Sequence, residues 1–339
     1  MKPRVLAVRQ DNNGDVLLAG PALRALAHGA SYVALLCGPS GEAAARALPD
    51  VDDVLAVEAP WIEAEPHAVE RAAIDALVDR VAAMRIDVAV IFTSFHQSPL
   101  PAALLLRMAG VRRIAAISED YSGALLDVRH RGVPDDVHEV ERALSLARAA
   151  GFALPPHDDA RLSMRVARTN PAAGAPYVVV HPGATVPARA WSRARNRELV
   201  AALRARGERV VVTGGTSERE LCAFVAVDGA ENLAGATDFP TLARVVAGAR
   251  AIVAGNTGAA HVAAAVDTPV VSLFPPTVPA ARFRPWMVPH VLLGDQTIAC
   301  RGCRARICPI EGQPCIDGVR VEDVLVALTR LRAARDDAA

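Results

Sequence analysis

Short apolar runs alternate along the chain with longer amphipathic stretches whose apolar residues recur at a helical spacing. In the first half this pattern predicts strands separated by helices. The predicted strands cover residues 5–8, 32–36, 87–92 and 114–117, and the predicted helices cover 21–27, 69–84, 100–109 and 138–150. Such alternation indicates a parallel sheet with helices on both faces.

The same rhythm returns in the second half. Strands are predicted at residues 177–181, 209–213, 251–254, 270–273 and 290–293, and helices at 192–206, 218–225, 240–247, 258–266 and 321–332. Ser192 stands where it would N-cap the first of these helices. The chain is therefore predicted to be α/β, with two Rossmann-like domains of similar size.

Residues 168–176 separate the two series, and they are rich in proline, glycine and alanine. Because they show no periodicity, we predict an interdomain linker there. The predicted domains are then 1–167 and 177–320, followed by a C-terminal helix over 321–335. Open parallel sheets bind ligands at the carboxyl ends of their strands, so we expect the site in a cleft between the domains.

Composition narrows the class of protein. Of the 339 residues, 52% are apolar but only 4% are aromatic, which predicts cores built of alanine, valine and leucine. A formal net charge of zero argues against nucleic acid as a partner. No apolar run approaches the length of a membrane helix, and the first residues do not resemble a signal peptide. We expect a cytoplasmic protein, for which peripheral membrane contact stays open.

Two loops carry candidate chemistry. Residues 254–261 join an apolar strand to an alanine-rich helix that starts near Gly258; backbone N–H groups, Thr257 and the helix N-terminus would converge there on an anionic ligand such as a nucleotide. Residues 9–18 follow the first strand, and Gly14 permits a tight turn. Asp15 could deprotonate an acceptor hydroxyl. A helix cap is its alternative role, and Asp11 is a rival base.

Four blocks of sequence occur in a fixed order along most of the chain. The first block is Asn-Asn-Gly-Asp-Val-Leu-Leu at 12–18, followed by Pro-Ala-Leu-Arg-Ala-Leu at 21–26, and the second is Val-Val-His-Pro-Gly-Ala at 179–184, followed by Arg-Ala-Trp at 189–191. The third is Val-Thr-Gly-Gly at 212–215, followed by Glu218. The fourth begins at 254–261 and continues through 268–277 to Pro-Trp at 285–286. Together they make the chain resemble glycosyltransferase family 9, the ADP-heptose:lipopolysaccharide heptosyltransferases.

The resemblance implies a GT-B fold, with the acceptor held mainly by the first domain and the nucleotide-sugar by the second. It implies transfer of a heptose or a related sugar, from ADP-heptose or a similar donor, to a hydroxyl of a glycan, a glycolipid or a small molecule. Lipopolysaccharide core is the family's usual acceptor. No cofactor would be required. One base and no protein nucleophile indicate single displacement with inversion.

The resemblance also assigns residues. It makes Asp15 the general base and places Thr185 and Arg189 at the donor diphosphate, Glu218 near the ribose, and Thr257, Gly258 and His261 at the donor phosphates or sugar. Arg189 would stabilise the charge of the departing diphosphate. The chain departs from the family at Asn256, where aspartate is usual, and an amide carries no charge. Asn256 therefore puts the mode of donor binding, and the donor itself, in question.

Several of these side chains have simpler alternative roles. His261 could pack within or hydrogen-bond its own helix, Arg189 could be a surface arginine, and Trp191 could anchor a core. His96 and Gln97 follow a strand and are candidate acceptor contacts, although an ordinary polar loop would look the same. Another predicted loop holds Arg129, His130 and Arg131, which could meet a phosphorylated acceptor or simply be solvated.

The four C-terminal cysteines follow a C-x2-C-x4-C-x6-C spacing: Cys300, Cys303, Cys308 and Cys315. This spacing suits structural zinc or an iron–sulfur centre. Reduced thiols and a disulfide are the alternatives, and similar cysteines occur in part of the family. The segment is expected to secure the last helix and to take no part in catalysis.

The principal hypothesis is an inverting glycosyltransferase. The alternative is a nucleotide-sugar-binding protein without transferase activity, or an epimerase of GT-B type, and Asn256 is its support. A dinucleotide-dependent oxidoreductase is disfavoured, because no G-x-G-x-x-G with a later acidic residue follows the first strand.

Overall fold

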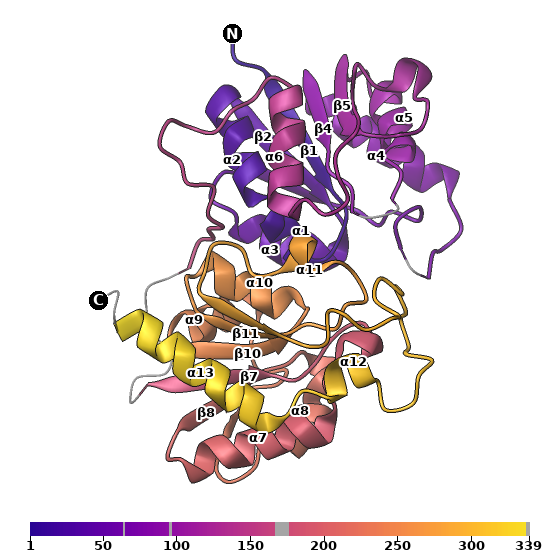
Figure 1. The fold of residues 1–339 in the computed structure, drawn as a ribbon. Coiled ribbons are helices and arrows are strands. Elements are labelled where there is room, and N and C mark those ends of the chain that lie inside the picture. Colours follow the sequence, from indigo (N-terminus) through magenta and orange to yellow (C-terminus); the bar gives the residue numbers. More distant parts are fainter. Residues whose placement is uncertain (64, 95–96, 167–175, 337–339) are drawn as a thin grey trace. The chain divides into compact units, whose positions relative to one another are not determined.

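The computed structural model describes residues 1–63, 65–94, 97–166 and 176–336. The chain divides into two compact units, Met1–Arg165 and Val166–Ala339. Each unit is an α/β layer structure around its own parallel sheet (Figure 1). The predicted linker lies almost wholly outside the described residues.

The N-terminal unit contains a parallel sheet in the order β3-β2-β1-β4-β5-β6. Its strands are β1 (Arg4–Arg9), β2 (Tyr32–Cys37), β3 (Asp53–Ala56), β4 (Val88–Ile91), β5 (Arg113–Ile117) and β6 (Val128–His130). Its helices are α1 (Asn13–Leu18), α2 (Gly20–Gly29), η1 (Pro39–Gly41), α3 (Glu42–Ala47), α4 (Arg71–Ala83), α5 (Leu100–Met108), η2 (Gly123–Leu125) and α6 (Glu139–Ala149). Helices α2 and α6 cover one face, and α4 and α5 cover the other (Figure 1).

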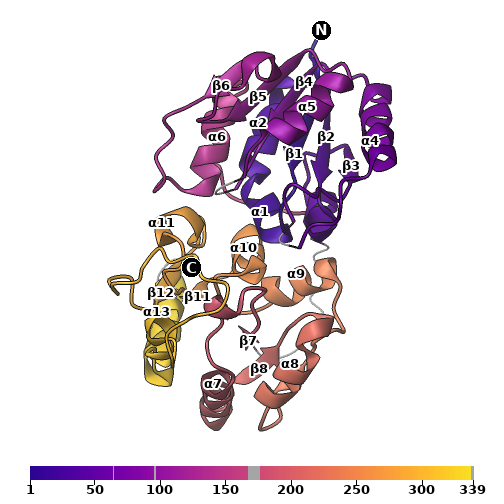
Figure 2. The same cartoon turned by 90° about the vertical axis from the view of Figure 1, so that its right-hand side faces the viewer.

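The C-terminal unit contains a parallel sheet in the order β12-β11-β10-β7-β8-β9. Its strands are β7 (Tyr177–His181), β8 (Arg209–Val212), β9 (Glu231–Asn232), β10 (Ala251–Gly255), β11 (Val270–Leu273) and β12 (His290–Leu293). Its helices are η3 (Pro187–Arg189), α7 (Arg193–Ala205), η4 (Thr216–Glu218), α8 (Arg219–Val225), α9 (Phe239–Ala247), α10 (Gly258–Ala265), α11 (Ala280–Phe283), α12 (Pro314–Asp317) and α13 (Val321–Asp336). Helices α9 and α10 cover one face, and α7, α8 and α13 the other (Figure 2).

The two sheets share one topology. In each, the first strand of the unit lies beside the fourth, so the strand order reverses between β1 and β4 and again between β7 and β10. At such a switch point the loops leaving neighbouring strands separate, and ligands of doubly wound sheets bind there, at the carboxyl ends. The loops that carry the candidate chemistry follow these four strands.

The predicted α/β architecture is confirmed, and its strongest strands were placed within a residue or two. Ser192 caps α7 as predicted, since its side chain accepts a hydrogen bond from the Arg195 N–H. Two local predictions were wrong. Residues 13–18 form helix α1 instead of a loop, and Arg129 and His130 belong to edge strand β6. Edge strand β6 is short and half-buried, so it lacks the apolar run by which the other strands were found.

Candidate active site

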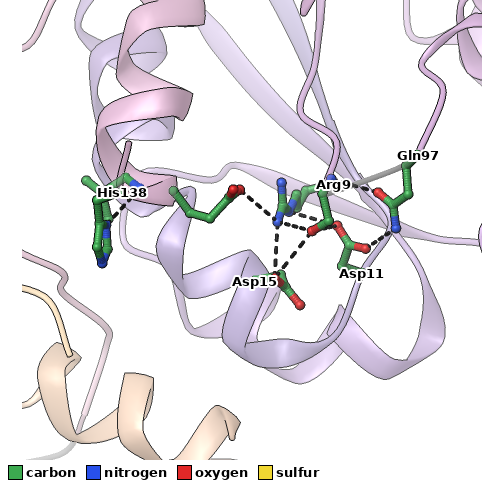
Figure 3. A network of polar contacts seen from close by, with 8 residues as sticks. Arg9, Asp11, Asp15, Gln97 and His138 are labelled. Atoms are coloured by element: carbon green, nitrogen blue, oxygen red, sulfur yellow. Dashed lines mark hydrogen bonds and ion pairs between the residues drawn. The ribbon is translucent and has the colours of Figure 1, made fainter. Parts of the chain in front are cut away.

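A buried arginine organises the switch point of the N-terminal sheet. Arg9 is the last residue of β1 and is 3% exposed. Its guanidinium forms ion pairs with Asp11, at 2.9 Å between Nε and Oδ2, with Asp15, at 3.2 Å, and with Glu139 of α6, at 3.7 Å (Figure 3). The β4 loop adds Ser94, whose hydroxyl lies 2.6 Å from Arg9 Nη2.

The three carboxylates differ in exposure. The side chains of Asp11 and Glu139 are 8% and 3% exposed, whereas that of Asp15 is 23% exposed. Asp15 is therefore the most solvent-accessible of the three carboxylates. Asp15 lies in the first turn of α1, and the N-cap residue of this helix is Asn12. The alternative role considered for Asp15, that of a helix cap, is therefore wrong.

Asp11 is held on both of its oxygens. Gln97 Nε2 donates a short hydrogen bond to Oδ1, and Ser94 Oγ donates to Oδ2 at 3.1 Å, the oxygen that also faces Arg9. In the described part of the chain, both contacts of Asp15 involve its Oδ1. This difference favours Asp15 over Asp11 as the proton acceptor. Gln97 thus supports the carboxylate cluster, and His96 lies outside the described residues.

The electrostatics of this cluster follow from its burial. Burial raises the pKa of Asp11 above its ordinary value, Arg9 opposes that shift, and Asp15 adds to it. Burial would lower the pKa of Arg9, but the carboxylates of Asp11, Asp15 and Glu139 raise it overall. Arg9 therefore stays charged and holds acidic groups together in a space with little water.

The loop after β10 gathers polar atoms that lack partners. Asn256 and His261 are 7% and 5% exposed. The buried Nδ2 of Asn256, Oγ1 of Thr257 and Nδ1 of His261 form no hydrogen bond within the described part of the protein. Buried polar atoms are normally paired, so three orphans at the start of α10 indicate a place where a ligand completes the bonding. His261 does not bond its own helix through Nδ1.

Arg189 ends η3 in the loop after β7. Gly255 brings this loop close to β10, because a β-carbon there would lie only 3.1 Å from the Arg189 carbonyl oxygen. Burial and the charge of Arg189 lower the pKa of His261 to about 4. The guanidinium, the neutral imidazole and the start of α10 thus form one positively polarised region, and the exposed Thr185 lies in the same loop as Arg189.

Glu218 lies at the carboxyl ends of β7 and β8. Its Oε2 accepts a hydrogen bond of 2.7 Å from the Gly215 N–H. A β-carbon at Gly183 would lie 1.7 Å from Glu218 Oε1, so any other residue there would require this carboxylate to move from its present position. Nearby, His181 Nδ1 lies 3.0 Å from the Thr213 hydroxyl, and burial lowers the pKa of His181, with Glu218 opposing the shift.

Trp191 packs in the hydrophobic core of the C-terminal unit and not at the candidate site. Trp191 is 3% exposed in the core beneath α7, which confirms its role as an anchor.

All four C-terminal cysteines are free thiols. Burial, and then the nearby Cys308, Cys300 and Cys303, raise the pKa of Cys315. Among the described residues no group of three or more metal-ligating side chains is arranged to hold an ion, so the structure gives no support to zinc at this spacing.

The basic group in the N-terminal unit is engaged with its own surroundings. Arg129 donates to the carbonyl oxygens of Ser118 and Glu119, and His130 Nε2 lies 3.1 Å from the Ser145 hydroxyl. These contacts fasten β6 to its neighbours, which favours a structural role for Arg129 and His130 over contact with a phosphate.

Sequence reasoning missed Arg9, Ser94 and Glu139 as members of the carboxylate cluster. Arg9 carried a usable signal, because a charged residue closing an otherwise apolar strand must find a partner when it is buried. Glu139 carried none: it belongs to the first turn of α6, far along the chain, where acidic residues are common for helix-dipole reasons alone.

The low pKa of His261 predicts a pH-dependent stability. An unfolded histidine takes up its proton near pH 6.5, whereas the folded one does so only near pH 4. Between these values the unfolded state binds more protons, so stability falls as the pH falls through this window. From pH 7 to pH 5 the loss is expected to be about 2 kcal/mol. Urea unfolding of His261→Asn should lack this component; an identical pH dependence in both proteins would contradict the shift.

Comparison with known proteins identifies the family. The model of glycosyltransferase family 9 (heptosyltransferase) matches residues 93–313, which is well over half of the chain. The chain belongs to glycosyltransferase family 9. The matched range contains the C-terminal site loops and Ser94 and Gln97, whereas β1 and α1, with Arg9, Asp11 and Asp15, lie before it.

Individual members of the family agree with this assignment. The chain is 37% identical over 193 residues to lipopolysaccharide heptosyltransferase 1 of Pseudomonas aeruginosa, covering 54% of each chain. It thus spans about half the length of the curated relatives it matches. Among solved structures, E. coli ADP-heptose lps heptosyltransferase II has a TM-score of 0.77 at 19% identity over 98% of this chain and 99% of that one.

E. coli heptosyltransferase WaaC with ADP-2-deoxy-2-fluoro heptose has a TM-score of 0.71 at 21% identity, over 96% of this chain and 99% of that one. At such identities the likeness concerns the fold, which is GT-B: two Rossmann-like units. The fold implied by the four sequence blocks is therefore confirmed. Among the described residues no helix is long and apolar enough to cross a bilayer.

Proposed function

We propose that this protein is an inverting glycosyltransferase that moves a heptose or a closely related sugar from a nucleotide-sugar to an acceptor hydroxyl. The proposal rests on one observation: this member of the family contains both a candidate base and a candidate anion-binding site. One is the accessible carboxylate Asp15 in the Arg9 cluster. The other is the polar, positively polarised start of α10 beside Arg189.

The N-terminal site would supply the base. Arg9 and Ser94 both contact Oδ1 of Asp15, which holds the carboxylate in place, and the side chain as a whole is 23% exposed. Removing a proton from the acceptor hydroxyl makes its oxygen a better nucleophile toward the anomeric carbon. Since the proposed mechanism uses one base and no protein nucleophile, the sugar is transferred in a single displacement that inverts its configuration.

The C-terminal site would hold the donor. Negative charge grows on the nucleoside diphosphate as it leaves, and Arg189 together with the N–H groups at the start of α10 can stabilise it. The uncharged His261 offers a ring nitrogen to the donor without adding positive charge. Glu218 and Thr185, on neighbouring loops of the same sheet end, are proposed contacts for the ribose and the diphosphate.

ADP-heptose is the proposed donor, and lipopolysaccharide core is the first acceptor to test. Two similarities support these choices: the chain resembles lipopolysaccharide heptosyltransferases in sequence, and the similar WaaC structure contains ADP-2-deoxy-2-fluoro heptose. A glycoconjugate outside lipopolysaccharide or a small metabolite is the broader acceptor class. The side-chain amide Nδ2 of Asn256 can donate a hydrogen bond, whereas the carboxylate usual at this position can only accept one. Asn256 therefore favours a nucleotide-sugar that presents a hydrogen-bond-accepting atom at this point.

A thermal-shift screen of ADP-, GDP- and UDP-sugars tests the donor assignment. Binding to the folded state raises the melting temperature in proportion to the logarithm of ligand concentration over Kd. We expect ADP-sugars to give the largest shift. A larger shift with a UDP- or GDP-sugar would overturn the choice of nucleotide while leaving the site in place.

Replacing Arg189 by alanine is expected to weaken the binding of ADP. Charge-assisted hydrogen bonds to a phosphate contribute about 1.5–3 kcal/mol, so Kd should rise roughly 10- to 100-fold. Isothermal titration calorimetry measures this directly. Arg189→Lys keeps the charge and should lose less. Equal affinities for the wild type and Arg189→Ala would remove Arg189 from the site.

A further inference from the structure

The C-terminal cysteine segment, residues 300–317, is fastened to the loop that carries Arg189. Ala188, the neighbour of Arg189, is 2% exposed, and both of its backbone polar groups are bonded by this segment. Its N–H donates to the Arg306 carbonyl oxygen at 3.0 Å. Its carbonyl oxygen accepts a 2.7 Å hydrogen bond from the side-chain amide of Gln313.

The same segment forms hydrogen bonds with two further points of the C-terminal unit. Asp317 Oδ1 accepts from the Ser192 N–H at 3.3 Å, at the far end of the Arg189 loop. The N–H groups of Gly302 and Arg304 donate to the carbonyl oxygens of Pro276 and Thr277, at 2.7 and 3.0 Å. The segment thereby ties the loop after β7 to the turn after β11, in addition to preceding helix α13.

The backbone conformation of Gln313 is one that residues with a side chain seldom adopt. Gln313 has φ 41° and ψ 61°, in the left-handed region, where a residue with a β-carbon is disfavoured by about 1 kcal/mol relative to glycine. Glycine would be the favoured residue at this N-cap of α12. Glutamine tolerates the strain here, and its amide reaches Ala188 across 125 positions of sequence.

We propose that Gln313 is a positioning residue for Arg189. Its amide fixes the carbonyl oxygen of Ala188, and this orients the next residue, so that the guanidinium is held toward the start of α10 before the donor binds. This inference rests on the proposed function, because it assigns Gln313 an effect on the diphosphate through Arg189. Gln313 itself does not touch the donor.

Two variants separate positioning from plain stability. Gln313→Gly removes the amide but relieves the left-handed strain, so the loss of the hydrogen bond and the relief of strain are expected nearly to cancel in the free energy of unfolding. Gln313→Glu keeps the size of the side chain and replaces the donating amide by an acceptor that repels the Ala188 carbonyl. Gln296→Ala is the matched control, because Gln296 donates the same kind of bond to the Phe274 carbonyl oxygen at 2.7 Å.

The experiment measures the Kd of ADP by calorimetry, the KM values for donor and acceptor, and the unfolding midpoint for each protein. We expect both Gln313 variants to raise the Kd of ADP and the KM of the donor about 3- to 10-fold, with the acceptor KM unchanged. Gln313→Gly should melt within a few degrees of the wild type. Gln296→Ala should bind ADP as the wild type does.

The outcomes are distinguishable. If the wild type binds ADP and both Gln313 variants bind it equally well, the positioning role is wrong and the proposed function stands. If the variants lose stability without any change in ADP affinity, Gln313 is structural only, which also overturns the inference. If the wild type itself does not bind ADP, the proposed donor site is wrong and this inference falls with it.

Discussion

Replacing Arg9 by methionine is expected to destabilise the N-terminal unit by about 3–5 kcal/mol, because it removes the buried cation that pairs with the Asp11, Asp15 and Glu139 carboxylates. Asp11 and Glu139 are almost wholly excluded from water, so neither can recover its hydration in the folded state. Burial already raises the pKa of Asp11 in the presence of Arg9. Without Arg9 that pKa should rise further, and the variant should recover part of its stability as the pH falls and the carboxyls take up protons.

Urea unfolding followed by circular dichroism measures this effect. Arg46→Met is the matched control: Arg46 also pairs with a carboxylate of its own unit, Glu42, but the pair is exposed. An exposed i,i+4 pair contributes about 0.3–0.5 kcal/mol, so the control should stay close to the wild type. A loss of less than 1 kcal/mol in Arg9→Met would show that Arg9 does not hold the cluster together.

Replacing Asp15 by asparagine is expected to lower kcat for transfer by about 100- to 10,000-fold, the usual contribution of a general base. Asparagine preserves the shape of the side chain and a hydrogen-bond acceptor for Arg9, but it takes up no proton at neutral pH. The Kd of ADP should stay within about twofold of the wild type, because the proposed donor contacts lie in the C-terminal unit.

Asp11→Asn distinguishes the two candidate bases. Both oxygens of Asp11 are engaged, by Gln97 and by Arg9 with Ser94, and its side chain is 8% exposed. Its loss should disturb the cluster and reduce kcat less than the loss of Asp15 does. Steady-state kinetics of the two variants at a common pH provide the comparison. A larger loss of kcat in Asp11→Asn than in Asp15→Asn would make Asp11 the base.

Much of the fold could be predicted because each buried parallel strand is a short apolar run bounded by polar loops. β7, β11 and β12 are examples that match the predicted ranges residue for residue. The strands that escaped prediction, β3, β6 and β9, are short and lie at or near sheet edges, where at least one neighbour is missing. Their sequences are too short, or too polar, to show a recognisable pattern of apolar positions.

The site was less accessible to sequence reasoning, for a physical reason. Loops could be located because they follow strands, and this placed Asp15, Arg189 and His261 at sheet ends. The contacts within each site come from residues distant in sequence: Glu139 reaches Arg9, and Gln313 reaches Ala188. No local pattern encodes such a contact, since it depends on how helices dock on the sheet.

The most direct test is a transfer assay with the purified full chain, ADP-heptose and lipopolysaccharide that lacks heptose. The acceptor is analysed by mass spectrometry, released ADP is measured in parallel, and Asp15→Asn serves as the control. The proposal predicts an acceptor heavier by one heptose, with one ADP released per transfer, and a rate of formation at least about 100-fold lower for both products with Asp15→Asn. Wild-type protein that binds the donor but leaves every offered acceptor unchanged, or that returns an epimerised donor, would contradict transfer and favour the non-transferase alternative.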